Sequence, residues 1–162
     1  MPKVELQKVF HVPLEKALEY FGNREVYSSA HARSDTTSTV LSQKDNEFVV
    51  EVKQTVGSQT IRYTIRTVYR LPQSIETETL DGIAKGSRQK VTLKSVPQGT
   101  EVTYVTDFKM HLGGAVGKAF GLVSGKMMKK MTKETMEEMA EVDRKHLEGD
   151  TQPQPPRSTA ER

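Results

Sequence analysis

Apolar residues change their spacing once along this chain, and that change limits the folds available to it. From residue 34 to residue 111 apolar and polar residues alternate, which is typical of strands with one buried side and one solvent-facing side. Turn-forming residues interrupt the alternation at 44–46, 56–58, 71–73, 81–82 and 97–99. The sequence therefore predicts six consecutive antiparallel strands in this region.

The alternation also predicts which side of each strand is buried. In IRYTIRTVYR, residues 61–70, the side expected to be buried carries Ile61, Tyr63, Ile65, Thr67 and Tyr69. Most of the opposite side carries Arg62, Thr64, Arg66 and Arg70. The same parity groups Phe48, Val50, Val52, Gln54 and Val56 in one strand, and Val102, Tyr104, Thr106, Phe108 and Met110 in another.

A further strand and two short helices are predicted ahead of these six strands. Residues 3–12 alternate as a half-buried strand does, and Pro13 has the φ angle that suits the first turn of a helix. Apolar residues then recur at helical spacing up to Gly22, and residues 24–32 are expected to form a second short helix.

After Gly113 and Gly114 the spacing of apolar residues becomes helical and stays so to about Leu147. One side of this long helix carries an apolar stripe: Val116, Phe120, Val123, Met127, Met128, Met131, Thr135, Met139 and Val142. Most of its basic residues lie on the other side. We therefore expect the stripe, with Met127 and Met131, to pack against the sheet.

The chain of 162 residues is long enough for one domain with a full core, which we place at residues 1–147. Residues 148–162 are rich in proline and polar residues and contain no large apolar side chain. Burial cannot offset the entropy of ordering such a segment, so we expect a disordered C-terminal tail.

The order of these elements resembles the helix-grip superfamily, which includes plant pollen allergens of the Bet v type, START domains and bacterial polyketide cyclase/dehydrase-like proteins. HVPLEKALEYFGNREVYSS (11–29) is similar to its strand-to-helix opening, and LGGAVGKAFGLVSGKMMKKMTKETMEEMAEV (112–142) to the Gly-rich entry of its terminal helix. The resemblance implies an α+β fold: a seven-stranded curved antiparallel sheet, two short helices, and a long C-terminal helix packed over the concave face. It also implies a cavity between sheet and helix.

Strand parity and the helical stripe together suggest which side chains line that cavity. These are Val50, Val52, Gln54, Tyr63, Ile65, Tyr69, Gln89, Tyr104, Thr106, Phe108, Phe120, Val123, Met127 and Met131. Hydroxyl and amide groups on an otherwise apolar wall are typical of small-molecule pockets. The alternative is that these polar side chains bond to one another or to the backbone and fill a solid core.

The sequence offers little support for catalysis or for a cofactor. It contains no cysteine, its four histidines lack metal-ligand spacing, and it has no phosphate-loop, dinucleotide-binding or nucleophile-elbow motif. His31 and Glu138 are the best candidates for acid–base chemistry, with solvated side chains as the alternative. We therefore predict no catalytic residue, no metal and no cofactor.

Charge indicates the partners and the compartment that we expect. The net charge is +3, and Lys118, Lys126, Lys129, Lys130 and Lys133 form a basic helix face. This face permits weak contact with anionic membranes, or it is simply a solvated helix face. Aromatic residues are not interleaved with these lysines, so we expect no nucleic-acid binding. The absence of cysteine and of long apolar runs favours a cytoplasmic location, and the oligomeric state is not predicted.

These observations favour the binding or transport of a hydrophobic or amphipathic small molecule, such as a lipid, a polyketide or an isoprenoid-like compound. One alternative is a cofactor-independent cyclase, dehydratase or hydrolase acting in the same cavity. Another is a cochaperone-like protein-binding module. Convergent titratable groups in the cavity would favour the enzyme, and an exposed apolar patch over a collapsed cavity would favour the protein-binding module.

Overall fold

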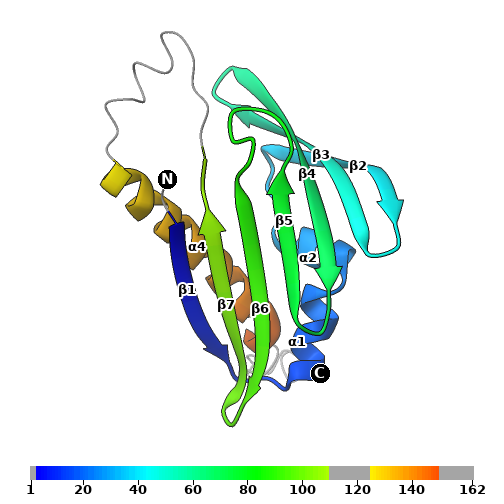
Figure 1. The fold of residues 1–162 in the computed structure, drawn as a ribbon, viewed down its shortest axis with the longest axis vertical. Helices are drawn as coiled ribbons and strands as arrows, with labels where there is room; N and C mark the ends of the chain where they lie inside the picture. Colours follow the sequence, from blue (N-terminus) through cyan, green and yellow to red (C-terminus); the bar gives the residue numbers. More distant parts are fainter. Residues whose placement is uncertain (1–2, 110–124, 150–162) are drawn as a thin grey trace, which may run out of the picture.

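A computed structural model describes residues 3–109 and 125–149 of the chain. Seven strands form one antiparallel sheet in the order β1-β7-β6-β5-β4-β3-β2, which confirms the predicted strand plan. The strands are β1 Lys3–Phe10, β2 Thr36–Lys44, β3 Glu47–Val56, β4 Gln59–Arg70, β5 Ser74–Thr79, β6 Arg88–Val96 and β7 Gly99–Asp107. Consecutive strands are neighbours except that β1 pairs with β7, so the first and last strands of the chain lie side by side (Figure 1).

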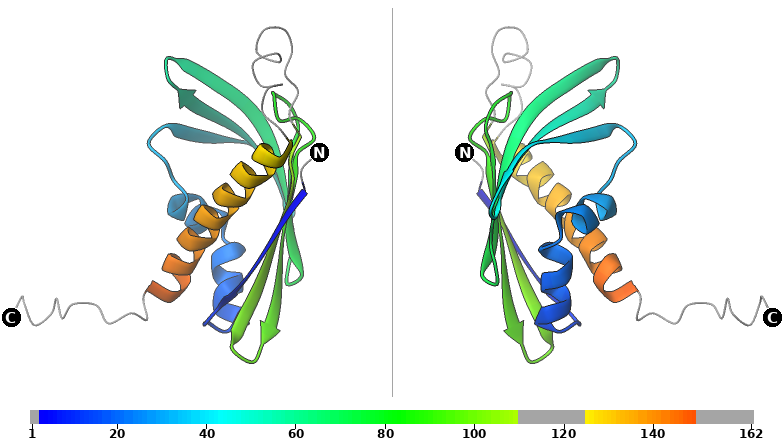
Figure 2. Two further views of the ribbon diagram at one scale, coloured as in Figure 1. Left: turned by 90° about the vertical axis from the view of Figure 1, so that its left-hand side faces the viewer. Right: turned by 90° about the vertical axis from the view of Figure 1, so that its right-hand side faces the viewer.

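In the described ranges, three helices lie on the concave side of this curved sheet: α1 Leu14–Phe21, α2 Arg24–Ala30 and α4 Gly125–Glu148 (Figure 2). The two short helices occur where the sequence predicts them. Pro13 precedes α1 in an extended conformation, and the Asn23 side chain caps α2 by accepting a hydrogen bond of 3.2 Å from the Val26 N–H. In the part of the chain that is described, no helix is long and apolar enough to cross a membrane.

The buried side of α4 differs from the predicted stripe. Met136, Ala140, Asp143 and Leu147 are each at most 2% exposed, whereas Met127 and Met131 are 53% and 54% exposed. The prediction that Met127 and Met131 pack against the sheet is therefore wrong. Two physical reasons account for this difference. The first turns of α4 extend beyond the edge strand β1 (Figure 1). The buried side also carries the Asp143 carboxylate, which a search for apolar residues does not select.

Several predictions fall on residues outside the described ranges. They are the Gly-rich entry to the terminal helix, the cavity residues Phe120 and Val123, and the tail after Gly149. Glu148, assigned to the tail from the sequence, is the last residue of α4, and its carboxylate accepts a hydrogen bond of 2.7 Å from the His11 backbone N–H. Helix ends shift by a residue or two in this way because the final turn depends on local partners.

The packed core fills only one part of the concave face. Its largest fully buried side chains come from β1, α1, β7 and α4 and include Phe10, Phe21, Tyr104, Met136 and Leu147. On the other strands, Val50, Val52 and Ile75 are also buried. Only Ile75 of these three belongs to the main hydrophobic cluster, because the sheet curves away from α4 toward β2 (Figure 2).

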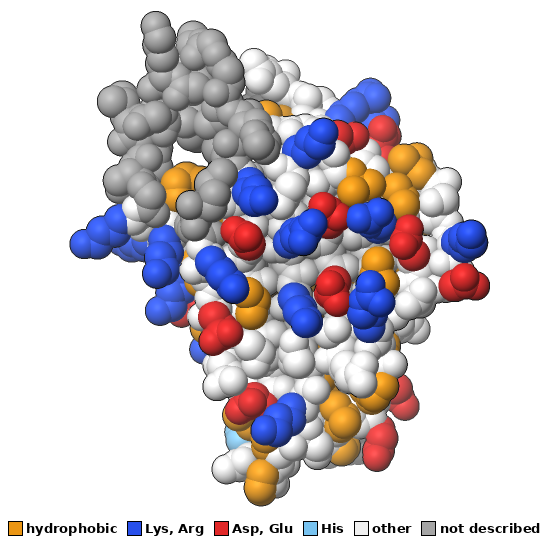
Figure 3. All heavy atoms as spheres, viewed as in Figure 1, with side chains coloured by type: hydrophobic (Ala, Val, Ile, Leu, Met, Phe, Trp, Pro, Cys, Tyr) orange, Lys and Arg blue, Asp and Glu red, His pale blue; other side chains and the backbone are white. Residues whose placement is uncertain are grey.

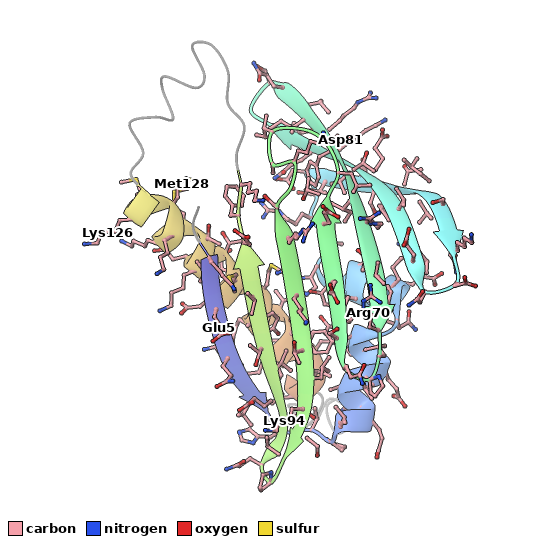
Figure 4. The ribbon with its side chains drawn as sticks, viewed as in Figure 1. Glu5, Arg70, Asp81, Lys94, Lys126 and Met128 are labelled. Atoms are coloured by element: carbon pink, nitrogen blue, oxygen red, sulfur yellow. The ribbon has the colours of Figure 1, made fainter. Side chains whose placement is uncertain are left out.

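The convex face of the sheet is polar, as the strand parity predicts. Arg66 and Arg88 both pair with Glu78, at 2.6 and 3.4 Å, and Arg70 pairs with Glu76 at 3.1 Å. Figure 3 shows basic and acidic side chains interspersed over this face, and Figure 4 labels Arg70 among them. Such exposed ion pairs add little stability, but they show that the arginines of β4 face away from the helices.

The docking of α4 can be tested with two matched methionines. Met136→Ala removes a side chain that is 2% exposed and should lower the free energy of unfolding by about 2 to 5 kcal/mol. Met131→Ala, on the exposed side of the same helix, should change it by less than about 0.5 kcal/mol. Urea titration of both variants measures the difference. Equal losses would contradict the assignment of the buried side.

Candidate functional site

A cavity of about 340 Å³ lies between the outer strands of the sheet, the helix pair and α4. Its floor is apolar and is made by Val50, Val52, Ile65, Ile75 and Val91. Val50 lies directly opposite Ile65 across β3 and β4, and Ile75 lies opposite Val91 across β5 and β6. Directly opposed residues point to the same face of a sheet, so register alone brings these side chains together.

A few polar groups interrupt the apolar floor. The hydroxyls of Thr67 and Thr77 lie 3.3 Å apart, and the Gln89 amide donates a weak hydrogen bond to the Met139 sulfur at 3.9 Å. Burial raises the pKa of Tyr69, and nearby Arg24 offsets part of that rise, so the phenol stays a neutral hydroxyl. These groups are suited to orienting a ligand by hydrogen bonds.

One face of α2 forms a wall of the cavity. Arg24, Tyr27, Ser28 and His31 line it, and their spacing of three, four and seven residues places them on one side of the helix and its cap. The Arg24 guanidinium lies 5.5 Å from the centre of the Phe48 ring, which is a cation–π distance. None of the described residues lining this cavity is acidic, and Arg24 and Arg33 are basic.

A buried carboxylate lies behind this wall. Asp143 on α4 is fully buried, and its oxygens accept hydrogen bonds of 2.6 Å from the Tyr20 hydroxyl and of 2.6 Å from the Tyr104 hydroxyl. His31 Nε2 lies 2.7 Å from the oxygen shared with Tyr20. Burial and then the charge of Asp143 raise the pKa of both tyrosines, so they remain neutral donors. We call these four residues the Asp143 cluster.

The Asp143 cluster determines which nitrogen of His31 carries a proton. An ionised carboxylate can only accept hydrogen bonds, so the imidazole must donate from Nε2. In the neutral ring Nδ1 is then an acceptor, and it has no hydrogen-bond partner within residues 3–109 and 125–149. The His31 side chain is 18% exposed and lines the cavity. The His31 ring thus contacts Asp143 through Nε2 and is also part of the cavity wall.

Five of the predicted cavity residues line this cavity: Val50, Val52, Ile65, Tyr69 and Gln89. Tyr104 is fully buried in the Asp143 cluster instead. Four others are partly exposed and are not part of the lining: Gln54, Tyr63, Thr106 and Phe108. Met127 and Met131 are exposed on α4, and Phe120 and Val123 lie outside the described ranges.

Sequence reasoning missed Tyr20 and Asp143. One signal was present for Asp143, because it has helical spacing from Met136, Ala140 and Leu147 and so interrupts an apolar row with a carboxylate. Of the two acid–base candidates, His31 belongs to the cluster, whereas Glu138 is exposed.

Two other depressions are less suited to a hydrophobic ligand. One of about 930 Å³ opens widely between the helix pair and the end of α4, and its lining mixes Lys16 and Arg24 with Glu19 and Glu25. Another, of about 410 Å³, lies among the ion pairs of the convex face. Within the described ranges, no group of three His, Asp or Glu side chains is placed to hold a metal ion. The cavity beside His31 is therefore the candidate site.

Solved structures with the same fold extend over nearly the whole chain. An aromatase/cyclase from Streptomyces sp. R1128 is 17% identical, with 91% of this chain and 92% of that chain covered and a TM-score of 0.66. A START superfamily protein from Mycobacterium smegmatis is 16% identical, with 91% and 97% covered and a TM-score of 0.68. At these identities the likeness shows the fold alone.

The sequence itself matches one protein-family model. No curated protein matches it. The model for "polyketide cyclase / dehydrase and lipid transport" matches residues 1–143, which include every strand, the helix pair and most of α4. With the helix-grip fold and the cavity on its concave face, this match shows that the chain belongs to the polyketide cyclase/dehydrase and lipid transport family.

Proposed function

We propose that this protein binds a hydrophobic or amphipathic small molecule in the cavity between the sheet and its helices. The observation that carries the proposal is the apolar floor of a cavity of about 340 Å³ on the concave face. Small-molecule sites are commonly about 300 to 1,000 Å³ and mostly apolar, with a few polar groups. Family membership supports the same class of function.

The size and the polarity of the cavity favour a compact ligand with one polar end. A volume near the lower end of that range suits a ring system or a short chain better than a two-chain lipid. Burying about 200 Å² of apolar ligand surface on Val50, Val52 and Ile65 would supply about 5 kcal/mol, before the cost of association. Arg24 and His31 at the α2 wall suit a polar or anionic group.

Filling the cavity should weaken binding of a hydrophobic dye. Val52→Trp places a large ring on the cavity floor and should weaken uptake of the uncharged dye N-phenyl-naphthylamine at least about tenfold, with little loss of stability. In a solid core the same change would overpack the interior and lower the free energy of unfolding by about 1 to 3 kcal/mol. Lys53→Trp, whose side chain leaves the opposite face of β3, is the matched control. Unchanged dye uptake in Val52→Trp would contradict a ligand in this cavity.

The preference for a polar end can be measured with two related dyes. Anilinonaphthalene sulfonate carries an anionic group that N-phenyl-naphthylamine lacks. Arg24→Gln should weaken binding of the sulfonate by about tenfold, since a charge-assisted hydrogen bond contributes about 1.5 kcal/mol, and should leave binding of the uncharged dye nearly unchanged. Arg62→Gln, which changes an exposed arginine on β4 that does not line the cavity, is the control. Equal losses for both dyes would show that Arg24 is not the polar contact.

We also propose that the start of α4 contacts anionic membranes. Lys126, Lys129, Lys130 and Lys133 are exposed there, beside the exposed Met131, and Lys126 extends away from the sheet (Figure 4). Each lysine near an anionic bilayer contributes about 1 kcal/mol. We expect the protein to sediment with phosphatidylserine-containing vesicles at low salt, and less so after Lys129 and Lys130 are both changed to Gln. Equal binding to vesicles of phosphatidylcholine alone would contradict this contact.

A further inference from the structure

The two edge strands of the sheet differ in how they are protected from pairing with another chain. β1 carries the charged side chains of Lys3, Glu5 and Lys8 along its length, and it packs against α4. β2 forms the opposite edge, where it pairs with β3, and no described strand or helix lies beyond it (Figure 1). Charged side chains and a covering helix are two ways in which proteins block an edge strand. Over residues 36–43, β2 has neither.

The composition of β2 is suited to strand pairing. Residues 36–43, TTSTVLSQ, contain no charge and no proline, and half of them are β-branched. Every residue from Thr37 to Lys44 is exposed, and the apolar residues Val40 and Leu41 are 39% and 56% exposed. A long, uncharged edge strand with exposed apolar side chains is the kind that adds a strand from another molecule.

Backbone hydrogen bonds leave every second residue of β2 unpaired on its outer side. The Thr55 N–H donates to the Asp35 carbonyl at 2.8 Å, so Asp35 bonds toward β3. In an antiparallel ladder such residues alternate with residues whose N–H and C=O groups point away from the partner strand. Up to the register shift after Val40, the residues that point outward are Thr36, Ser38 and Val40. Their backbone groups are available to a further strand.

We propose that the outer edge of β2 pairs antiparallel with β2 of a second copy of this chain. A second copy fits because the uncharged segment has charges of opposite sign at its two ends, Asp35 before it and Lys44 after it. An antiparallel copy places each Asp35 near Lys44 of the partner subunit, whereas an in-register parallel copy would bring like charges together. Exposed ion pairs add little affinity, so their role is to fix the orientation. The proposal concerns assembly and does not depend on a ligand in the cavity.

The bulge in β2 puts both terminal charges on the same face of the sheet. Thr36 faces the concave side, because it lines the cavity. Gln43 also faces the concave side, because it lies opposite Phe48, which lines the cavity too. Neighbouring residues of a strand point to opposite faces, so Asp35 and Lys44 both point to the convex side. The carboxylate of one copy and the ammonium group of the other can therefore meet.

The centre of the proposed pair falls at Thr39. Its neighbours Ser38 and Val40 have the outward backbone groups, so Ser38 of each copy exchanges hydrogen bonds with Val40 of the partner subunit. Thr39 then lies opposite Thr39 of the partner subunit, with both side chains on the convex face. Ser38 also lines the cavity, so the second copy lies along the cavity rim.

Sedimentation velocity of the full chain tests the pairing. Between about 5 µM and 1 mM we expect a monomer–dimer equilibrium with a Kd of about 10 to 500 µM, since one strand pair is a small interface. Thr39→Lys places two ammonium groups opposite each other and should raise the Kd at least about tenfold. Glu51, opposite Thr39 on β3, offers the new side chain an opposite charge, so the monomer should stay folded.

Gln7→Lys is the matched control, because it adds the same charge to an exposed position of the other edge strand, β1. It should leave the Kd of the dimer unchanged. A monomer at every concentration would overturn the proposal. So would a dimer that Thr39→Lys does not weaken, or one that both variants weaken equally.

A second variant tests the hydrogen bonds instead of the charge. Ser38→Pro removes an N–H that points away from β3, so the ladder inside one copy stays complete while the pair between copies loses hydrogen bonds. It should also raise the Kd at least about tenfold, with an unchanged circular dichroism spectrum. In the wild type, amide exchange of Ser38 and Val40 should slow as the concentration rises, whereas that of Thr39, which bonds toward β3, should not. A dimer with no such slowing would overturn β2 as the interface.

The antiparallel orientation has its own readout. Asp35→Lys or Lys44→Asp alone should weaken the dimer about three- to tenfold at low salt, and both changes in one chain should restore it. Arg33 pairs with Asp35 at 3.2 Å, and Glu47 lies opposite Lys44, within the same copy. Both neighbours are present in monomer and dimer alike, so the Kd reports the contact between copies. Unchanged Kd values in both single variants, or no recovery in the double variant, would overturn the antiparallel pairing.

Discussion

A buried carboxylate is the constraint on which the arrangement of the helices depends. Asp143 is fully excluded from solvent, and a charge in that position is stable only when its hydrogen bonds are satisfied. Tyr20, Tyr104 and His31 satisfy it from α1, β7 and the end of α2. Each bond therefore joins a different element to α4. Loss of one donor would leave a buried carboxylate oxygen without that hydrogen bond and would lower the free energy of unfolding by about 1 to 3 kcal/mol.

This polar cluster also separates the packed half of the molecule from the hollow half. On one side Phe10, Phe21 and Leu147 pack between sheet and helices at full burial. On the other side the strands curve away from α4, and the apolar floor around Val50 and Val52 faces a cavity. His31 belongs to both halves, since its Nε2 atom contacts Asp143 and its side chain is part of the cavity lining.

The predicted faces of the strands were accurate, and so was the presence of a long C-terminal helix, but the predicted buried side of α4 was wrong at Met127 and Met131. Two-residue alternation assigned Ile65 and Tyr69 to the inner face and Arg66 to the outer face, as the structure has them, because a strand's side-chain direction follows from its own sequence. On α4 the apolar stripe selected Met127 and Met131, which are exposed. The side that a helix buries depends on the groups that its neighbours offer. Here Tyr20 and Tyr104 donate hydrogen bonds to Asp143, so the side of α4 that carries this aspartate is buried.

Local spacing of side chains along single elements was enough to predict the strand count, the inner faces of β3, β4 and β7, and the helix pair. The helix-grip class came from the resemblance of the whole arrangement to a known superfamily. Local spacing also predicted part of the cavity floor, since Val50, Val52 and Ile65 share a face by parity. The meeting of His31 with Asp143, 112 residues apart in the chain, could not be predicted in this way. That contact requires α2 and α4 to be placed against the same end of the sheet, and only the packing of the folded chain determines their distance and rotation.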